Sequence, residues 1–278
     1  MIEGPDPEVV ASDVRRALEE DLGAGDLTAG LIPASSEFST RVICREDAIL
    51  AGRDWFTETF RQLDPRVQLT WAYRDGESIG SGQTVCDLGG PARTILSGER
   101  TALNFLQTLS ATATKARRYH DAVRGTGAVI LDTRKTLPGL RHAQKYAVRC
   151  GGASNHRTGL FDAILVKENH IAAAGSITAA VHGAREAHPE VLLEVEVENL
   201  GQLAEAVAAG ADRALLDNFP LAELRAAVRE FAKQIAMEAS GGISIETVRT
   251  VAETGVDFIS VGALTKNVRA VDFSMRFL

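Results

Sequence analysis

The sequence predicts an α/β protein in which an antiparallel N-terminal part is followed by a shortened or open barrel of parallel strands. From about Phe38 to Leu96, short runs of alternating polar and apolar residues are separated by glycine-rich turns, which is typical of antiparallel strands. After Thr126, short apolar runs recur with helical patterns between the later ones, which is typical of parallel strands joined by helical crossovers.

In the N-terminal part, helical spacing of apolar residues predicts a helix over 8–22 that ends at Gly23, and a second helix over 98–116. The strands predicted between these helices are 40–44, 67–73 and 83–88. An apolar tail at the end of the chain is expected to pack back on this part. We therefore expect an N-terminal domain over 1–110, with 267–278 packing back on it, and a barrel domain over 111–266.

The apolar runs expected to form the parallel strands are 128–131, 163–166, 191–193, 214–216, 235–237 and 258–261. Asn199, Pro220 and Ser244 are start signals for helices between the later runs. The span 127–265 has room for five or six strand–helix units. A complete eightfold barrel usually needs about 250 residues, so we expect a shortened or open barrel.

Composition and charge exclude several classes of protein. Apolar residues make up 45% and charged residues 24% of the chain, which excludes a disordered protein. The net charge of −7 and the aromatic content of 5% argue against a nucleic-acid-binding surface. The N-terminus has no signal-peptide pattern, no apolar stretch approaches the roughly 18 residues of a membrane helix, and the three cysteines have no pairing or metal spacing. We expect a soluble, cytoplasmic protein that binds neither nucleic acid nor membranes.

Chargeable or small polar residues follow the apolar runs, at the ends where barrel enzymes place their active sites. They include Asp132 to Lys135, Lys167, Glu194 and Glu196, Asp217, Glu238 with Ser240, and Gly262. The charge also segregates: residues 132–170 carry seven Lys and Arg against three acids, whereas 190–238 carry ten acids against four bases. If both segments line one mouth, a basic wall faces an acidic wall, which suits a polyanionic substrate and its divalent cation.

Three glutamates alternate with valines in the third run. Glu194, Glu196 and Glu198 would share one face of a strand, where their mutual repulsion requires lysines or a metal as partners. We expect Glu196 to be a site residue and Glu194 to be its lysine-paired neighbour, with Glu198 at the helix start.

Glycine turns follow the two last runs. Backbone amides of the segments 240–242 and 262–263 are candidates for phosphate binding, although Ser240-Gly241-Gly242 is about as often a plain turn. The segment 151–157 reads equally well as a helix terminus with a solvated arginine or as a site loop. Cys150 is more readily explained as a packed thiol than as a nucleophile.

The motifs at 99–104, 132–141, 145–148, 151–157, 165–170, 194–199, 216–218 and 260–265 closely resemble the quinolinate phosphoribosyltransferase family. The resemblance runs from about Ala17 to the end of the chain. It implies an N-terminal α/β sandwich and an open α/β barrel of about seven strands. It also implies the reaction of quinolinate with phosphoribosyl pyrophosphate and Mg²⁺, which yields nicotinate mononucleotide, pyrophosphate and CO₂ in NAD biosynthesis.

The resemblance further implies a homo-oligomer, a dimer or a hexamer, in which Arg100 enters the neighbouring active site. The implied catalytic residues are Lys135, Lys167, Glu196 and Asp217, and Mg²⁺ is implied at Glu196 and Asp217, largely through the pyrophosphate. The implied substrate-binding residues are Arg100, Thr133, Arg134, Lys135, His156, Arg157, Lys167, Glu196, Asp217, Ser240, Gly241, Gly242, Val261, Gly262 and Ala263.

Other functions stay open on the residues themselves. One is a related enzyme on the same scaffold that uses another anionic acceptor. Another is a barrel isomerase or lyase that acts on a sugar phosphate through a Lys–Glu pair. A third is a non-catalytic binder of phosphorylated nucleotides.

Overall fold

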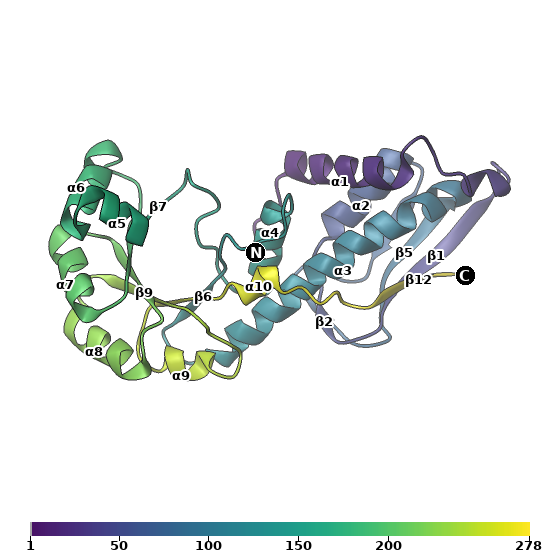
Figure 1. Ribbon diagram of the computed structural model, residues 1–278. Helices are drawn as coiled ribbons and strands as arrows, with labels where there is room; N and C mark the ends of the chain where they lie inside the picture. Colours follow the sequence, from purple (N-terminus) through teal and green to yellow (C-terminus); the bar gives the residue numbers. More distant parts are fainter. Residues whose placement is uncertain (1) are drawn as a thin grey trace. The chain divides into compact units, whose positions relative to one another are not determined.

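The computed structural model describes residues 2–278, which form two compact units (Figure 1). The first unit holds the chain up to Arg117 together with Thr136–Gly152 and Leu264–Leu278. The second unit holds Arg118–Lys135 and Ala153–Ala263. Among the described residues, no helix combines the length and the apolarity that crossing a bilayer requires.

The first unit contains an antiparallel sheet in the order β12-β1-β5-β3. Its strands are β1 (Glu37–Cys44), β3 (Gln68–Trp71), β5 (Thr84–Pro91) and β12 (Phe273–Phe277). The three strands predicted between residues 40 and 88 are therefore confirmed, with ends shifted by a few residues. The apolar tail forms β12, which pairs with β1 because its alternate residues Phe273 and Met275 are buried against the core of this unit.

Helices cover one face of this sheet in two layers. The helices of the first unit are α1 (Pro7–Leu22), α2 (Arg53–Leu63), α4 (Arg141–Cys150) and α3 (Ala92–Ala122), whose last residues, from Arg118 on, belong to the second unit. Its short elements are η1 (Ala29–Leu31), β2 (Ala48–Ile49), β4 (Ser78–Ile79) and α10 (Ala263–Lys266), whose first residue belongs to the second unit. One apolar core joins the sheet to α2 and α3, and a second joins α2 and α3 to α1 and α4. The first helix ends before Gly23 as predicted, whereas α3 is longer than the predicted 98–116 and α2 was not predicted.

The second unit contains a six-stranded parallel sheet in the order β6-β11-β10-β9-β8-β7. The strands are β6 (Val129–Leu131), β7 (Ile164–Val166), β8 (Leu193–Val197), β9 (Arg213–Asp217), β10 (Ala236–Ser240) and β11 (Phe258–Ser260). Each of the six predicted runs thus overlaps a strand, although the run 191–193 shares only Leu193 with β8. Along the outer edge of β6, Ser154 makes a parallel bridge to Leu131, so this residue occupies the place of a seventh strand and the sheet stays open between it and β7.

Helices follow the strands of the second unit and lie outside the sheet (Figure 1). They are α5 (Glu168–Ala174), α6 (Ile177–Ala187), α7 (Leu200–Ala209), α8 (Leu221–Phe231) and α9 (Val248–Ala252). Asn199 caps α7 as predicted, because its side chain accepts the backbone N–H of Gln202. Pro220 precedes the first residue of α8. The helix start predicted at Ser244 is wrong: Ser244 opens a turn, and α9 begins only at Val248.

Candidate active site

A cavity of about 320 Å³ lies in the second unit, at the carboxyl ends of its parallel strands. We call it the barrel cavity. Nine of the predicted site residues line it, namely Thr133, Arg134, Lys135, His156, Arg157, Lys167, Glu196, Asp217 and Ser240. Its other lining residues are Leu165, Leu215, Glu238 and Ser260. Residues far apart in sequence meet here because parallel strands point their carboxyl ends to one edge of the sheet.

The remaining predicted residues do not line the barrel cavity. Gly262 packs against two residues that do line it: a Cβ on Gly262 would come 3.1 Å from Cδ of Lys135 and 3.5 Å from Oγ1 of Thr133. Gly241 has φ +100°, and a Cβ there would approach Oδ1 of Asn218 to 2.1 Å, so only glycine fits. Gly242, Val261 and Ala263 adjoin these turns. Arg100 is exposed on α3 of the first unit.

An ion pair joins Lys167 to Glu196 at the cavity wall. Lys167 is the N-cap of α5, and its backbone N–H donates to Nδ1 of His170. The prediction that Glu194 is the lysine-paired carboxylate is wrong. Leu165 of β7 is in register with Glu194 of β8, so Lys167, two residues further on, lies level with Glu196 instead.

The basic side of the barrel cavity carries Arg134 and Lys135, which follow β6, and Arg157 from the loop after α4. Burial and the neighbouring positive charge of Arg134 lower the pKa of Arg157. Nη1 of the Arg157 guanidinium donates to the carbonyl oxygen of Ala163 at 3.2 Å. Two arginines that repel each other in a half-buried position favour an anion between them.

The acidic side carries Glu196 and Asp217, from the neighbouring strands β8 and β9. Asn218 follows Asp217 in the left-handed conformation, with φ 55°, which asparagine tolerates. Its side-chain amide donates to Asp217 at 2.8 Å, and its backbone N–H donates to the carbonyl oxygen of Ser240 at 2.9 Å. This turn aligns the end of β9 with the end of β10.

A cluster of buried side chains adjoins the cavity, and two of its members, His156 and Glu238, also line it. His156 Nε2 is 2.9 Å from Glu194 Oε2 and 3.4 Å from Glu238 Oε2, and Nη1 of Arg213 is also 3.4 Å from Glu238. Both carboxylates are almost fully buried, at 1% and 0% exposure. Burial and the negative charge of Glu194 raise the pKa of Glu238 to about 7. Glu238 lines the cavity but was not among the predicted site residues. It stands two residues before the predicted Ser240, and residues two apart in a strand share a face, so this spacing was the signal in the sequence that could have identified it.

Two opposite influences act on the His156 ring. Burial lowers its pKa, but the hydrogen bond to Glu194 and the charges of Glu238 and Glu194 outweigh burial and raise the pKa. At the same time, Nδ1 accepts the backbone N–H of Arg157 at 2.7 Å, which leaves no room for a proton on Nδ1. The hydrogen bond at Nδ1 therefore directs the ring proton to Nε2, which faces Glu194.

The raised pKa of Glu238 makes stability depend on pH. Its folded-state pKa of about 7 lies above the ordinary 4.5, so its favourable contribution is complete below pH 4.5 and is lost as the pH rises to about 7. Glu238→Gln removes this dependence. We expect the variant to gain about 2 to 3 kcal/mol relative to the wild type between pH 5 and pH 8. Urea unfolding, monitored by circular dichroism at each pH, measures this gain. Glu230→Gln, at an exposed glutamate, is the control and should show no gain.

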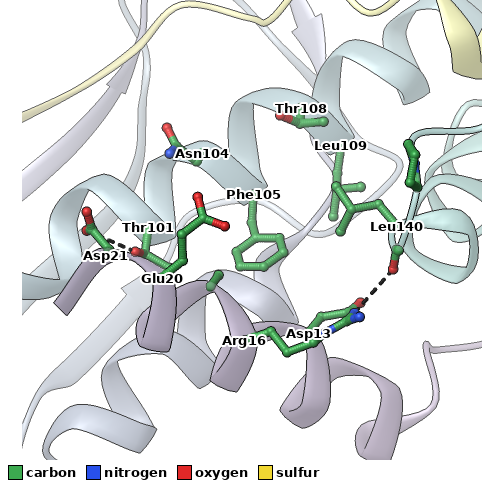
Figure 2. A pocket seen from close by; sticks show the side chains of 13 residues that line it. Asp13, Arg16, Glu20, Asp21, Thr101, Asn104, Phe105, Thr108, Leu109 and Leu140 are labelled. Atoms are coloured by element: carbon green, nitrogen blue, oxygen red, sulfur yellow. Dashed lines mark hydrogen bonds and ion pairs between the residues drawn. The ribbon is translucent and has the colours of Figure 1, made fainter. Parts of the chain in front are cut away.

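A second cavity, of about 440 Å³, lies in the first unit between α1, α3 and the segment 138–140 (Figure 2). Three acids, Asp13, Glu20 and Asp21, line it together with one arginine, Arg16. Asp13 is bonded to Arg16 and to the indole N–H of Trp55. Although this cavity is larger than the barrel cavity, its predominantly negative wall repels anionic substrates.

Comparison with known proteins agrees with this geometry. The family profile of the quinolinate phosphoribosyl transferase N-terminal domain matches residues 26–110, and that of the C-terminal domain matches residues 112–276. The chain belongs to the quinolinate phosphoribosyl transferase family. The resemblance seen in the sequence motifs is thereby confirmed.

Relatives in this family match nearly the whole chain. A nicotinate-nucleotide pyrophosphorylase (carboxylating) from Mycobacterium leprae is 44% identical over 94% of this chain and 95% of its own. A probable enzyme of the same name from Bacillus subtilis is 44% identical over 92% of this chain and 89% of its own. The structure of the nicotinate-nucleotide pyrophosphorylase from Francisella tularensis superimposes with a TM-score of 0.95 at 44% identity, covering 100% of this chain and 99% of that chain.

Proposed function

We propose that the barrel cavity catalyses the reaction of this family, in which the phosphoribosyl group of phosphoribosyl pyrophosphate is transferred to quinolinate. The products are nicotinate mononucleotide, pyrophosphate and CO₂. The observation that carries the proposal is that the cavity brings together a pair of arginines, Arg134 and Arg157, and a pair of carboxylates, Glu196 and Asp217, which come from β8 and β9. The first suits a dicarboxylate, and the second suits a sugar hydroxyl and a cation-bound phosphate.

The roles of the side chains follow from charge. Arg134 and Arg157 hold the carboxylates of quinolinate, with His156 at the edge of the same wall. Lys135 and Lys167 lie where the two anionic substrates meet and offset their repulsion. Ser240 and the backbone at Gly241, Gly242, Val261, Gly262 and Ala263 hold the 5′-phosphate, with Thr133 beside Gly262.

Catalysis is mainly positioning and electrostatic stabilisation. The pyridine nitrogen attacks the anomeric carbon of the ribose as the bond to pyrophosphate breaks. Positive charge that develops on the ribose is stabilised by Glu196 and Asp217. The bond between the ring and the carboxylate adjacent to the alkylated nitrogen then breaks and CO₂ leaves. The electron pair stays on the ring carbon, where the neighbouring positive nitrogen stabilises it until that carbon takes up a proton.

Glu196 and Asp217 fit a Mg²⁺ ion that is bound mainly through the pyrophosphate. Mg²⁺ prefers one or two protein carboxylates together with substrate phosphates, and these two carboxylates are on adjacent strands of one cavity. When bound, the ion would neutralise charge on the pyrophosphate leaving group.

The proposal includes a homo-oligomer, a dimer or a hexamer, in which Arg100 of one chain completes the quinolinate site of another. Exposure of Arg100 on the first unit supports this arrangement, because the side chain is accessible to a second copy. We also propose that the enzyme acts in the cytoplasm. Its cysteines, Cys44, Cys86 and Cys150, are free and buried, which suits a reducing compartment.

Product analysis tests the proposed function. The purified protein is incubated with quinolinate, phosphoribosyl pyrophosphate and Mg²⁺, and nicotinate mononucleotide and CO₂ are measured. We expect the two products in equal amounts, and no turnover when nicotinate replaces quinolinate, because the basic wall then loses one carboxylate contact. Absence of product, or equal turnover of nicotinate, would contradict the proposal. Binding of both substrates without turnover would indicate a non-catalytic protein.

A further inference from the structure

Glu194 is a buried charged residue to which the reaction assigns no role. It is on β8, is 1% exposed and does not line the barrel cavity. Its Oε2 contacts Nε2 of His156 at 2.9 Å, and its Oε1 has no hydrogen-bond partner among the described residues. Burial of a carboxylate with one unsatisfied oxygen is costly. A fold that keeps this group therefore points to a use for its contact with His156.

Hydrogen bonds on both ring nitrogens of His156 link Glu194 to the main chain of Arg157 at the cavity. Nδ1 of His156 accepts the backbone N–H of Arg157 at 2.7 Å, so Glu194, His156 and the main chain of Arg157 form one hydrogen-bonded series. Asp132, which is fully buried, holds the loop of residues 155–157 through a second set of hydrogen bonds. Its two oxygens accept the backbone N–H of His156 at 2.9 Å and the side-chain amide of Asn155 at 2.6 Å.

We propose that Glu194 is a positioning residue for the dicarboxylate-binding wall. By orienting the His156 ring it fixes the main chain of Arg157, so that the guanidinium of Arg157 faces the cavity. The inference rests on the proposed function, because it assigns Arg157 to the carboxylates of quinolinate. It goes beyond that function in giving a specific task to a residue that touches neither substrate.

A metal ion is the alternative occupant of the cluster. One ligand atom from each of His156, Glu194 and Glu238 lies within 4.8 Å of the others. The guanidinium of Arg213 is already 3.4 Å from Glu238, and the proton on Nε2 of His156 already faces Glu194. These two donors already face Oε2 of each carboxylate, so hydrogen bonding explains the arrangement without an ion.

Steady-state kinetics of two variants test the proposal. Glu194→Ala removes the acceptor for Nε2–H, and we expect the KM for quinolinate to rise about 10- to 100-fold while the KM for phosphoribosyl pyrophosphate changes less than about 3-fold. Glu194→Gln keeps an acceptor oxygen at the same place and should recover most of the loss. This rescue distinguishes positioning by a hydrogen bond from a general loss of structure.

The matched control is Glu198→Ala, which removes an exposed glutamate from the end of the same strand face and should leave both KM values unchanged. If Glu194→Ala is not recovered folded, Glu194→Asp replaces it, because the shorter carboxylate keeps its charge but withdraws from Nε2. An unchanged KM for quinolinate in the folded variant, or equal rises for both substrates, would overturn the proposal.

Measurements on the same proteins distinguish two further outcomes. If the wild-type protein does not turn over quinolinate, the proposed function fails before the variants are compared. If EDTA lowers the melting temperature of the substrate-free wild type but not that of Glu194→Ala, the cluster binds a metal and the positioning proposal is overturned. We expect EDTA to leave both melting temperatures unchanged.

Discussion

Arg134→Ala is expected to raise the KM for quinolinate by at least about 30-fold, because the loss of one charge-assisted contact in a half-buried site costs about 2 kcal/mol or more. The KM for phosphoribosyl pyrophosphate should change little, since Arg134 follows β6, which β11 and β10 separate from the strands that carry Asp217 and Glu196. Initial-rate measurements with each substrate varied in turn check the division of the cavity into two walls.

Two comparisons sharpen this result. Arg134→Lys keeps the charge but loses the planar pair of donors, so it should recover only part of the lost affinity. Arg229→Ala removes an exposed arginine on α8 of the same unit and should change neither KM. Equal losses for the two substrates in Arg134→Ala would contradict the assignment of the basic wall to quinolinate.

Glu196→Gln is expected to lower kcat by about 100- to 1000-fold, because it removes a negative charge from the place where positive charge develops on the ribose. The substitution also leaves Lys167 without its ion-pair partner. Single-turnover measurements at saturating substrate concentrations separate this effect on the chemical step from product release.

Glu198→Gln is the control for this substitution, since Glu198 is exposed just beyond β8 whereas Glu196 lines the cavity. Its kcat should stay within about 2-fold of the wild type, as for other surface substitutions away from a site. A similar loss in both variants would show that the negative charge of this strand end acts at long range, and would remove the specific role of Glu196.

The local pattern of apolar and polar residues was sufficient to predict most of the strands and helices. The parallel strands were predicted because strands buried on both faces are almost continuously apolar, as at 128–131 and 258–261. The side chains of the cavity were predicted because they stand directly after those runs, where strand ends meet. The helix α2 was missed because its buried aromatic residues, Trp55, Phe56 and Phe60, follow Gly52 without a capping side chain.

Only the tertiary structure shows which charged side chains of the site pair with one another. The charge segregation between 132–170 and 190–238, hidden in a net charge of −7, was readable from residue order alone. That order placed charged residues at the strand ends and pointed to an anion-binding site. It led to the wrong prediction of which glutamate meets a lysine, because the register between β7 and β8 arises from hydrogen bonds between segments nearly thirty residues apart. That register pairs Lys167 with Glu196 and leaves Glu194 to His156, since a shift of two residues along a strand moves a side chain from the cavity wall into the buried layer beneath it.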